Sequence, residues 1–167
     1  TDVGPLANEA QVRTLADQVE RSVRAGARLL TGGHPLNRQG FYFAPGVLTN
    51  ITPDSPAYRE EVFGPVALLF RARDIDEAIA IANDSPFGLG ASAWTKDPRS
   101  SDRFIAELDA GMVFINGMVA SDPRLPFGGV KQSGFGRELS AYGLREFLNI
   151  KTVWIQQEGA QPLSRSE

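Results

Sequence analysis

The sequence has 167 residues, enough for one domain with a substantial apolar core. Its 17 basic and 20 acidic residues give a net charge of −3, which argues against a dedicated nucleic-acid-binding protein. The absence of cysteine excludes thiolate chemistry, disulfides and iron–sulfur clusters within these residues. The single histidine, His34, lies in a Gly-Gly-His-Pro loop, so no metal site is expected. The longest apolar run is far shorter than the ~20 residues that span a bilayer, and no signal-peptide pattern opens the sequence. We therefore expect a cytoplasmic protein that binds neither nucleic acid nor membrane.

The first part of the chain alternates helical and extended patterns. Apolar residues at helical spacing predict an amphipathic helix over residues 8–27. Extended segments follow at residues 28–31 and 42–48. The second of them contains Pro45, which cannot donate a hydrogen bond within a central ladder, so it is predicted to be an edge strand.

The pattern of strand and helix then continues. Residues 65–70 form an apolar run without alternation, which is typical of a strand covered on both faces. An Asp-x-x-Glu capping box at 74–77 predicts the start of a helix. The next predicted elements are a strand over 89–95, a helix over 100–109 and a buried strand over 112–116.

This alternation predicts an α/β fold, with a parallel-dominated open sheet, flanking helices and an additional C-terminal strand. Residues 117–136 are rich in glycine and proline without periodicity, and a loop of this length is usually functional. A short helix is predicted over 138–147, and the β-branched and aromatic residues of 149–156 indicate a terminal strand. The chain divides into a main body (1–147), a strand segment (148–158) and a polar tail (159–167).

Two segments have residue types suited to ligand binding. In Glu60-Glu61-Val62-Phe63-Gly64-Pro65, a carboxylate can accept two hydrogen bonds from a vicinal diol and an aromatic ring can offer a flat wall to a heterocycle. The alternative is a solvated acidic turn with Phe63 as a core anchor. The glycine-rich segment 126–138 has neither a P-loop nor a complete dinucleotide fingerprint, so we expect it to shape a pocket wall.

Several motifs together resemble the C-terminal third of the aldehyde dehydrogenase superfamily, and they are similar to its succinate-semialdehyde dehydrogenase branch. They are EEVFGPV at 60–66, ANDSPFGL at 82–89, GMVFIN at 111–116, and 126–138 followed by Tyr142-Gly143. The resemblance implies that an aldehyde is oxidised to an acid with NAD or NADP, through attack by a cysteine, hydride transfer and hydrolysis of the thioester by a glutamate-activated water.

The same resemblance implies that the nucleophilic cysteine, the general-base glutamate and the cofactor domain all precede Thr1. We therefore expect this chain to be a fragment that is inactive without the N-terminal part of the enzyme. The alternative is a non-catalytic, self-associating module, either a truncation or a pseudoenzyme.

The resemblance also assigns residues to the cofactor. Glu61 matches the carboxylate that binds the nicotinamide-ribose hydroxyls, and Phe63 matches the aromatic residue beside the nicotinamide. Leu89 falls in a segment that lines the same neighbourhood. Glu138 matches a second carboxylate near the hydrolytic water and suits a proton relay, or it is only a favourable charge at a helix N-terminus.

For the substrate, Phe127 matches an aromatic residue of the aldehyde channel. Ser121 lies where many members carry a bulky apolar residue, and with Arg124 it could bind the distal carboxylate of a semialdehyde by charge-assisted hydrogen bonds. The alternative is that Arg124 points to solvent. The strand at 149–156 is expected to pair with a neighbouring subunit in a dimer or tetramer, or to fold back on its own chain.

Overall fold

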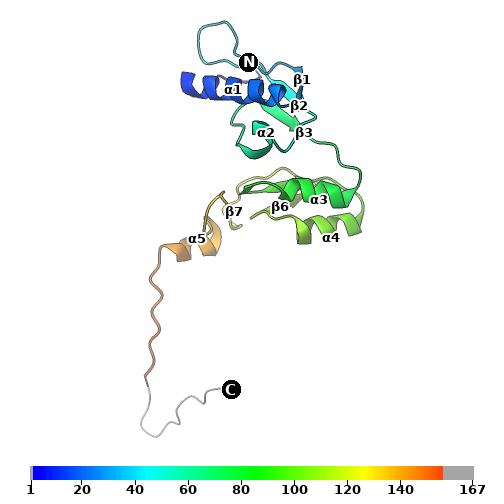
Figure 1. The fold of residues 1–167 in the computed structure, drawn as a ribbon. Coiled ribbons are helices and arrows are strands. Elements are labelled where there is room, and N and C mark those ends of the chain that lie inside the picture. Colours follow the sequence, from blue (N-terminus) through cyan, green and yellow to red (C-terminus); the bar gives the residue numbers. More distant parts are fainter. Residues whose placement is uncertain (1, 156–167) are drawn as a thin grey trace.

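The structure is a computed structural model that describes residues 2–155. It confirms an α/β fold with open sheets and flanking helices (Figure 1). The strands are divided among three small sheets, two of which have two strands each. The elements in chain order are α1 (Glu9–Arg24), β1 (Arg28–Thr31), β2 (Gly46–Thr49), α2 (Pro56–Arg59), β3 (Val66–Leu69), α3 (Ile75–Asn83), β4 (Phe87–Gly88), β5 (Ala91–Ala93), α4 (Pro98–Glu107), β6 (Val113–Ile115), β7 (Val130–Lys131) and α5 (Ser140–Glu146).

The first sheet has the order β1-β2-β3, with β1 and β2 antiparallel and β2 and β3 parallel. The prediction that the segment at 42–48 is an edge strand is therefore wrong, because β2 lies in the centre. Pro45 precedes Gly46, the first residue of the strand, so its missing N–H group does not interrupt the ladder.

The main core lies between this sheet and α1, the amphipathic helix that was predicted over residues 8–27. Asn8 caps α1, because its side chain accepts a hydrogen bond from the Gln11 N–H at 2.9 Å. The buried apolar side chains come from α1, β2, α2, β3 and the loops between them: Leu15, Val19, Ala27, Phe43, Leu48, Ala57 and Val66.

β3 differs from the expectation of a strand covered on both faces. Val66 is buried, whereas Ala67 and Leu69 are exposed, Leu69 to 54%. The prediction failed because β3 is an edge strand of a small sheet, and one of its faces is left uncovered in residues 2–155.

α3 begins where its capping box predicted, and α4 begins at Pro98, two residues before the predicted start. Asp74 caps α3 by accepting the Glu77 N–H at 2.9 Å, and Asp97 caps α4. The Glu77 carboxylate, however, accepts the N–H of Arg73 at 2.6 Å, one residue before the N-cap. The two helices lie next to each other (Figure 1).

Of the strand predicted at 89–95, only Ala91–Ala93 forms a strand, β5, and the short strand β4 precedes the predicted range. β4 pairs antiparallel with β7, and β5 pairs parallel with β6. The long loop at 117–136 thus contributes a short strand that brings its second half against the turn after α3. The strand predicted at 112–116 is only partly buried.

Beyond α5 the chain extends away from the body (Figure 1). Residues 149–155 belong to no strand in the structure, and their side chains are exposed. Their role in assembly therefore stays a prediction. Thr1, the rest of the strand segment from Gln156 and the predicted polar tail at 159–167 lie outside the described residues. None of the helices in residues 2–155 has the length and apolar character needed to cross a membrane.

Candidate functional site

A cavity of about 570 Å³, here called the central cavity, collects several of the predicted residues. Glu61 reaches it from the turn after α2. The other walls come from the end of α3 through β5, from the segment after α4, and from the segment after β7: Ala82, Ser85, Phe87, Gly88, Leu89, Gly90, Ala91, Leu108, Asp109, Ala110, Gln132 and Ser133. The structure therefore brings Glu61 and Leu89 to one site.

The adjacent carboxylates of Glu60 and Glu61 have different surroundings. Glu60 accepts a hydrogen bond from Gln18 Nε2 at 3.0 Å and two from Arg21 at 3.2 Å, and these partners, Gln18 first, lower the pKa of Glu60. The Glu61 backbone carbonyl accepts a bond from Gln18 Nε2 at 3.2 Å. Within residues 2–155, the Glu61 carboxylate makes neither a hydrogen bond nor an ion pair, so it remains available to a ligand in the cavity.

Phe63 is not brought into the central cavity. Its side chain is 68% exposed, which shows that the interpretation as a core anchor is wrong. Its carbonyl accepts a hydrogen bond from Gln11 Nε2 at 3.0 Å, which fixes the backbone of the turn against α1.

A second cavity of about 300 Å³ lies beside β6 and is called the apolar cavity. Phe127 lines it, but neither Ser121 nor Arg124 does. Its walls are Gly111, Met112, Val113, Phe114, Ala120, Asp122, Leu125, Pro126 and Phe127. Asp122 is thus the one acidic side chain among these walls.

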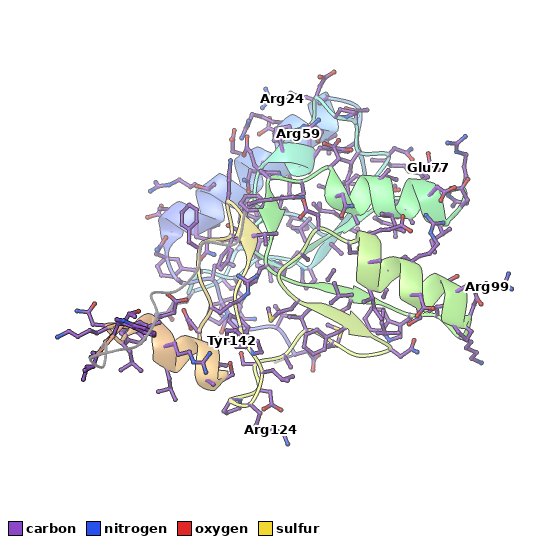
Figure 2. All side chains as sticks on the ribbon, turned by 90° about the horizontal axis from the view of Figure 1, so that it is seen from below. Arg24, Arg59, Glu77, Arg99, Arg124 and Tyr142 are labelled. Atoms are coloured by element: carbon purple, nitrogen blue, oxygen red, sulfur yellow. The ribbon has the colours of Figure 1, made fainter. Side chains whose placement is uncertain are left out.

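Arg124 points to solvent, as the alternative interpretation held (Figure 2). Asp122 holds it through bonds from Arg124 Nε at 2.9 Å and Nη2 at 2.6 Å, and also accepts the backbone N–H of Arg124 at 2.9 Å. These bonds lower the pKa of Asp122. Asp122 was not among the predicted site residues, although an Asp side chain often accepts the backbone N–H two residues later in a turn.

Glu138 lies apart from the central cavity. Its N–H donates to the Phe127 carbonyl at 2.6 Å, and the Phe127 N–H donates to the Glu138 carbonyl at 2.8 Å. The predicted helix starts later than expected, at Ser140, so Glu138 precedes the N-cap residue Leu139. Its backbone therefore anchors the apolar cavity to the start of α5.

Two partly buried glycines, Gly111 and Gly128, meet between the two cavities. Gly111 follows the wall of the central cavity and itself lines the apolar cavity. A β-carbon at Gly111 would collide with the carbonyl oxygen of Gly128, so only glycine permits this approach.

The structure also shows polar contacts that sequence reasoning did not find. Lys131 Nζ donates to the Asn83 carbonyl at 2.9 Å and lies 3.0 Å from Asp109 Oδ2. The Asn83 side chain accepts the Asp109 N–H at 2.8 Å and donates to the Glu107 carbonyl at 2.7 Å. Nothing in the local sequence pattern signalled that these residues meet.

No metal centre is apparent in the part of the chain that the structure describes, because no three His, Cys, Asp or Glu side chains gather there. His34 is an exposed loop residue whose Nδ1 lies 3.1 Å from the Gly32 carbonyl, as expected for a surface position.

Comparison with known proteins identifies the class to which this architecture belongs. Residues 1–153 match the aldehyde dehydrogenase family, and the chain therefore belongs to that family. The resemblance seen in the sequence motifs is confirmed.

Three individual relatives show how similar the chain is to known members of the family. The NADP(+) succinate-semialdehyde dehydrogenase 1 of Mycobacterium tuberculosis is 59% identical over 155 residues, which are 93% of this chain and 34% of the relative. The structure of succinic semialdehyde dehydrogenase from Streptococcus pyogenes in complex with NADP+ matches with a TM-score of 0.87 and 36% identity, over 92% of this chain and 34% of that one. An NAD-dependent aldehyde dehydrogenase from Sinorhizobium meliloti matches with a TM-score of 0.89 and 38% identity, over 98% of this chain and 32% of that one. The chain thus spans about a third of the length of these relatives.

Proposed function

We propose that this chain forms part of an NAD(P)-dependent aldehyde dehydrogenase that oxidises succinate semialdehyde to the acid. The observation that carries the proposal is the Glu61 carboxylate, which lines the central cavity together with Leu89 and has no partner among residues 2–155. Membership of the family and the likeness to succinate-semialdehyde dehydrogenases support it.

The central cavity suits the ribose of a nicotinamide dinucleotide. Its volume of about 570 Å³ lies in the range of small-molecule pockets. A carboxylate offers two acceptor oxygens to a vicinal diol, so Glu61 would hold the ribose hydroxyls and Leu89 would line the same pocket. Phe63, exposed at the end of the same turn, would pack beside the nicotinamide. When bound, the dinucleotide supplies the hydride acceptor.

The nucleophile must come from another part of the enzyme, because these 167 residues contain no cysteine. We propose that the general base and the cofactor domain lie outside this chain as well. The chain alone is therefore expected to be inactive. Its contribution is to orient the cofactor and to shape the path of the aldehyde.

The apolar cavity suits the carbon chain of the substrate, with Phe127 as one of its walls. The distal carboxylate of succinate semialdehyde would bind to Ser121 and Arg124. Arg124 is held by Asp122, so the substrate carboxylate has to replace Asp122 on the guanidinium group. Glu138 is proposed as a proton relay, with its backbone already fixed against Phe127.

The strand segment at 148–158 is proposed to pair with a neighbouring subunit in a dimer or tetramer. Support comes from its described part: Ile150 is 87% exposed and Trp154 is 66% exposed, and a segment with such apolar side chains is a template for pairing. The same exposure favours the second candidate function, a self-associating module without catalysis.

The experiment is a steady-state assay of the full-length enzyme that contains this chain, with NAD+ and NADP+ as oxidants and with succinate semialdehyde or propanal as substrate. We expect reduction of one or both dinucleotides and a higher kcat/KM for succinate semialdehyde, whereas this chain alone should show no aldehyde-dependent reduction. Similar values for the two aldehydes would contradict the substrate assignment. A full-length protein with no activity would favour the non-catalytic module.

A further inference from the structure

Lys131 has an unusual backbone conformation for its residue type. Its φ angle is 55°, in the left-handed region that glycine and asparagine adopt far more readily than lysine. Such a conformation persists where the surroundings determine it and where the side chain serves a purpose. Here β7 is paired with β4 through Lys131 and Phe87, and the Gln132 N–H donates to the Pro86 carbonyl at 2.9 Å.

The Lys131 side chain reaches the C-terminal end of α3. Its ammonium group donates to the carbonyl of Asn83, the last residue of that helix, where a positive charge is favourable and a carbonyl lacks a helical partner. It also pairs with Asp109, which lines the central cavity. The Lys131 side chain is 22% exposed and the Asp109 side chain is 56% exposed, so solvent screens the carboxylate end of this ion pair more than the ammonium end.

Asn83 and Asp109 are joined in turn by the hydrogen bond from the Asp109 N–H to Asn83 Oδ1. Lys131, Asn83 and Asp109 therefore form a closed triangle. Asp109 itself lines the central cavity, and Asn83 and Lys131 are each adjacent in sequence to a wall residue, Ala82 and Gln132 respectively. Just beyond Lys131, the Ser133 hydroxyl accepts the N–H of Gly88 at 3.0 Å, which fixes the cavity wall next to Leu89.

We propose that Lys131 is a positioning residue of the cofactor site. It touches neither substrate nor cofactor, and it acts by holding the three walls of the central cavity at the spacing that places a dinucleotide against Glu61. This inference rests on the proposed function, which assigns the central cavity to the cofactor. It explains why a lysine occupies a position where glycine or asparagine would adopt the backbone conformation with less strain.

The test uses the full-length enzyme and measures the Kd for NADP+ and NAD+ by fluorescence titration, together with the KM for succinate semialdehyde. Lys131→Met removes the charge. Lys131→Asn suits the left-handed backbone, but the asparagine side chain is too short to reach the Asn83 carbonyl and the Asp109 carboxylate. We expect both variants to bind their dinucleotide about tenfold more weakly, since displaced supporting groups commonly have effects of this size. The KM for the aldehyde should change less than about twofold, because the apolar cavity lies beyond the triangle.

Lys131→Arg keeps the charge and the reach, and we expect it to retain most of the affinity. Arg103→Met is the matched control: Arg103 on α4 pairs with Asp76 on α3 at 2.7 Å and with Glu107 on its own helix at 2.6 Å, yet it lines no wall of the central cavity. If Arg103→Met lowers the melting temperature as much as Lys131→Met but leaves the Kd unchanged, a merely structural role of Lys131 is excluded.

An unchanged Kd in both Lys131→Met and Lys131→Asn overturns the inference. So does a Kd that rises equally in Arg103→Met, since the effect would then follow stability. Binding measurements on Glu61→Gln show whether the role of Lys131 alone is wrong or the proposed function is wrong as well. If Glu61→Gln weakens dinucleotide binding and the Lys131 variants do not, the cavity assignment holds and only the role of Lys131 is wrong. If neither residue affects binding, both proposals are wrong.

Discussion

The neighbouring carboxylates of Glu60 and Glu61 allow a test in which each substitution is the control of the other. Both residues belong to the same turn, and each can be changed to glutamine with little change in volume. In the structure, Glu60 is bonded to Gln18 and Arg21 on α1, whereas the Glu61 carboxylate faces the central cavity. Glu60→Gln should therefore affect stability, and Glu61→Gln should affect function.

The magnitudes follow from these contacts. The Glu60 and Arg21 side chains are 42% and 40% exposed, so solvent screening limits their ion pair to about 0.2–1 kcal/mol. Partial loss of the hydrogen bond from Gln18 brings the expected destabilisation by Glu60→Gln to about 1 kcal/mol. For Glu61→Gln, loss of one charge-assisted bond to a ribose hydroxyl, about 1.5–3 kcal/mol, corresponds to a ten- to hundredfold decrease in cofactor affinity or hydride transfer.

The assay combines chemical denaturation of the full-length enzyme with dinucleotide titration and single-turnover kinetics. Glu61→Gln should keep the free energy of unfolding within about 0.5 kcal/mol of the parent, as is usual at positions without structural partners. If Glu61→Gln leaves affinity and hydride transfer unchanged, Glu61 is only a surface carboxylate. If Glu60→Gln impairs cofactor binding equally, the division of roles between the two residues is refuted.

Three further predictions concern other parts of the chain. Ser22→Ala should lower the free energy of unfolding by about 1–3 kcal/mol, because the buried Ser22 hydroxyl accepts the Ala57 N–H at 3.1 Å and alanine leaves that donor without a partner; denaturation that shows a loss under about 0.5 kcal/mol would contradict this. Asp122→Asn should release Arg124 and lower the KM for succinate semialdehyde about two- to fivefold, the range expected for an exposed pair, without affecting propanal. Because the pKa of Asp122 is lowered, its ion pair with Arg124 is present above the ordinary carboxyl pKa of about 3.9 and is lost only as the pH falls through the lowered value. The decrease in KM caused by Asp122→Asn should therefore be constant between about pH 5 and 8. An enzyme cut after Phe147 should sediment as a smaller species with its helices retained by circular dichroism; an unchanged oligomer would show that the strand segment is not the assembly element.

The helices were predictable because their signals are local. Asn8, Asp74 and Asp97 each cap the helix that the sequence placed after them. Strand order was not predictable in the same way, because it depends on pairing between distant segments. Pro45 suggested an edge strand, yet it lies just outside the ladder, and the edge strands of this sheet are β1 and β3.

In the candidate site, too, local motifs were informative, whereas contacts between distant segments could not be predicted. Motif resemblance selected Glu61 and Leu89, which meet in the central cavity. Sequence alone could not show how Glu60 and Glu61 differ, because the difference arises where α1 brings its side chains beside the turn. The contacts of Lys131 were missed for a similar reason, since its partners come from the ends of α3 and α4.

The close approach of Gly111 and Gly128 determines which side chains can change the shape of each cavity. The two backbones meet without side chains, so the partition between the central cavity and the apolar cavity has a fixed thickness. Phe127 lines the apolar cavity but not the central cavity, whereas the terminal methyl group of Met112 lies close to Gly90, a wall residue of the central cavity. A change in size at Phe127 is therefore expected to reshape the apolar cavity alone, whereas a change at Met112 is expected to affect both cavities.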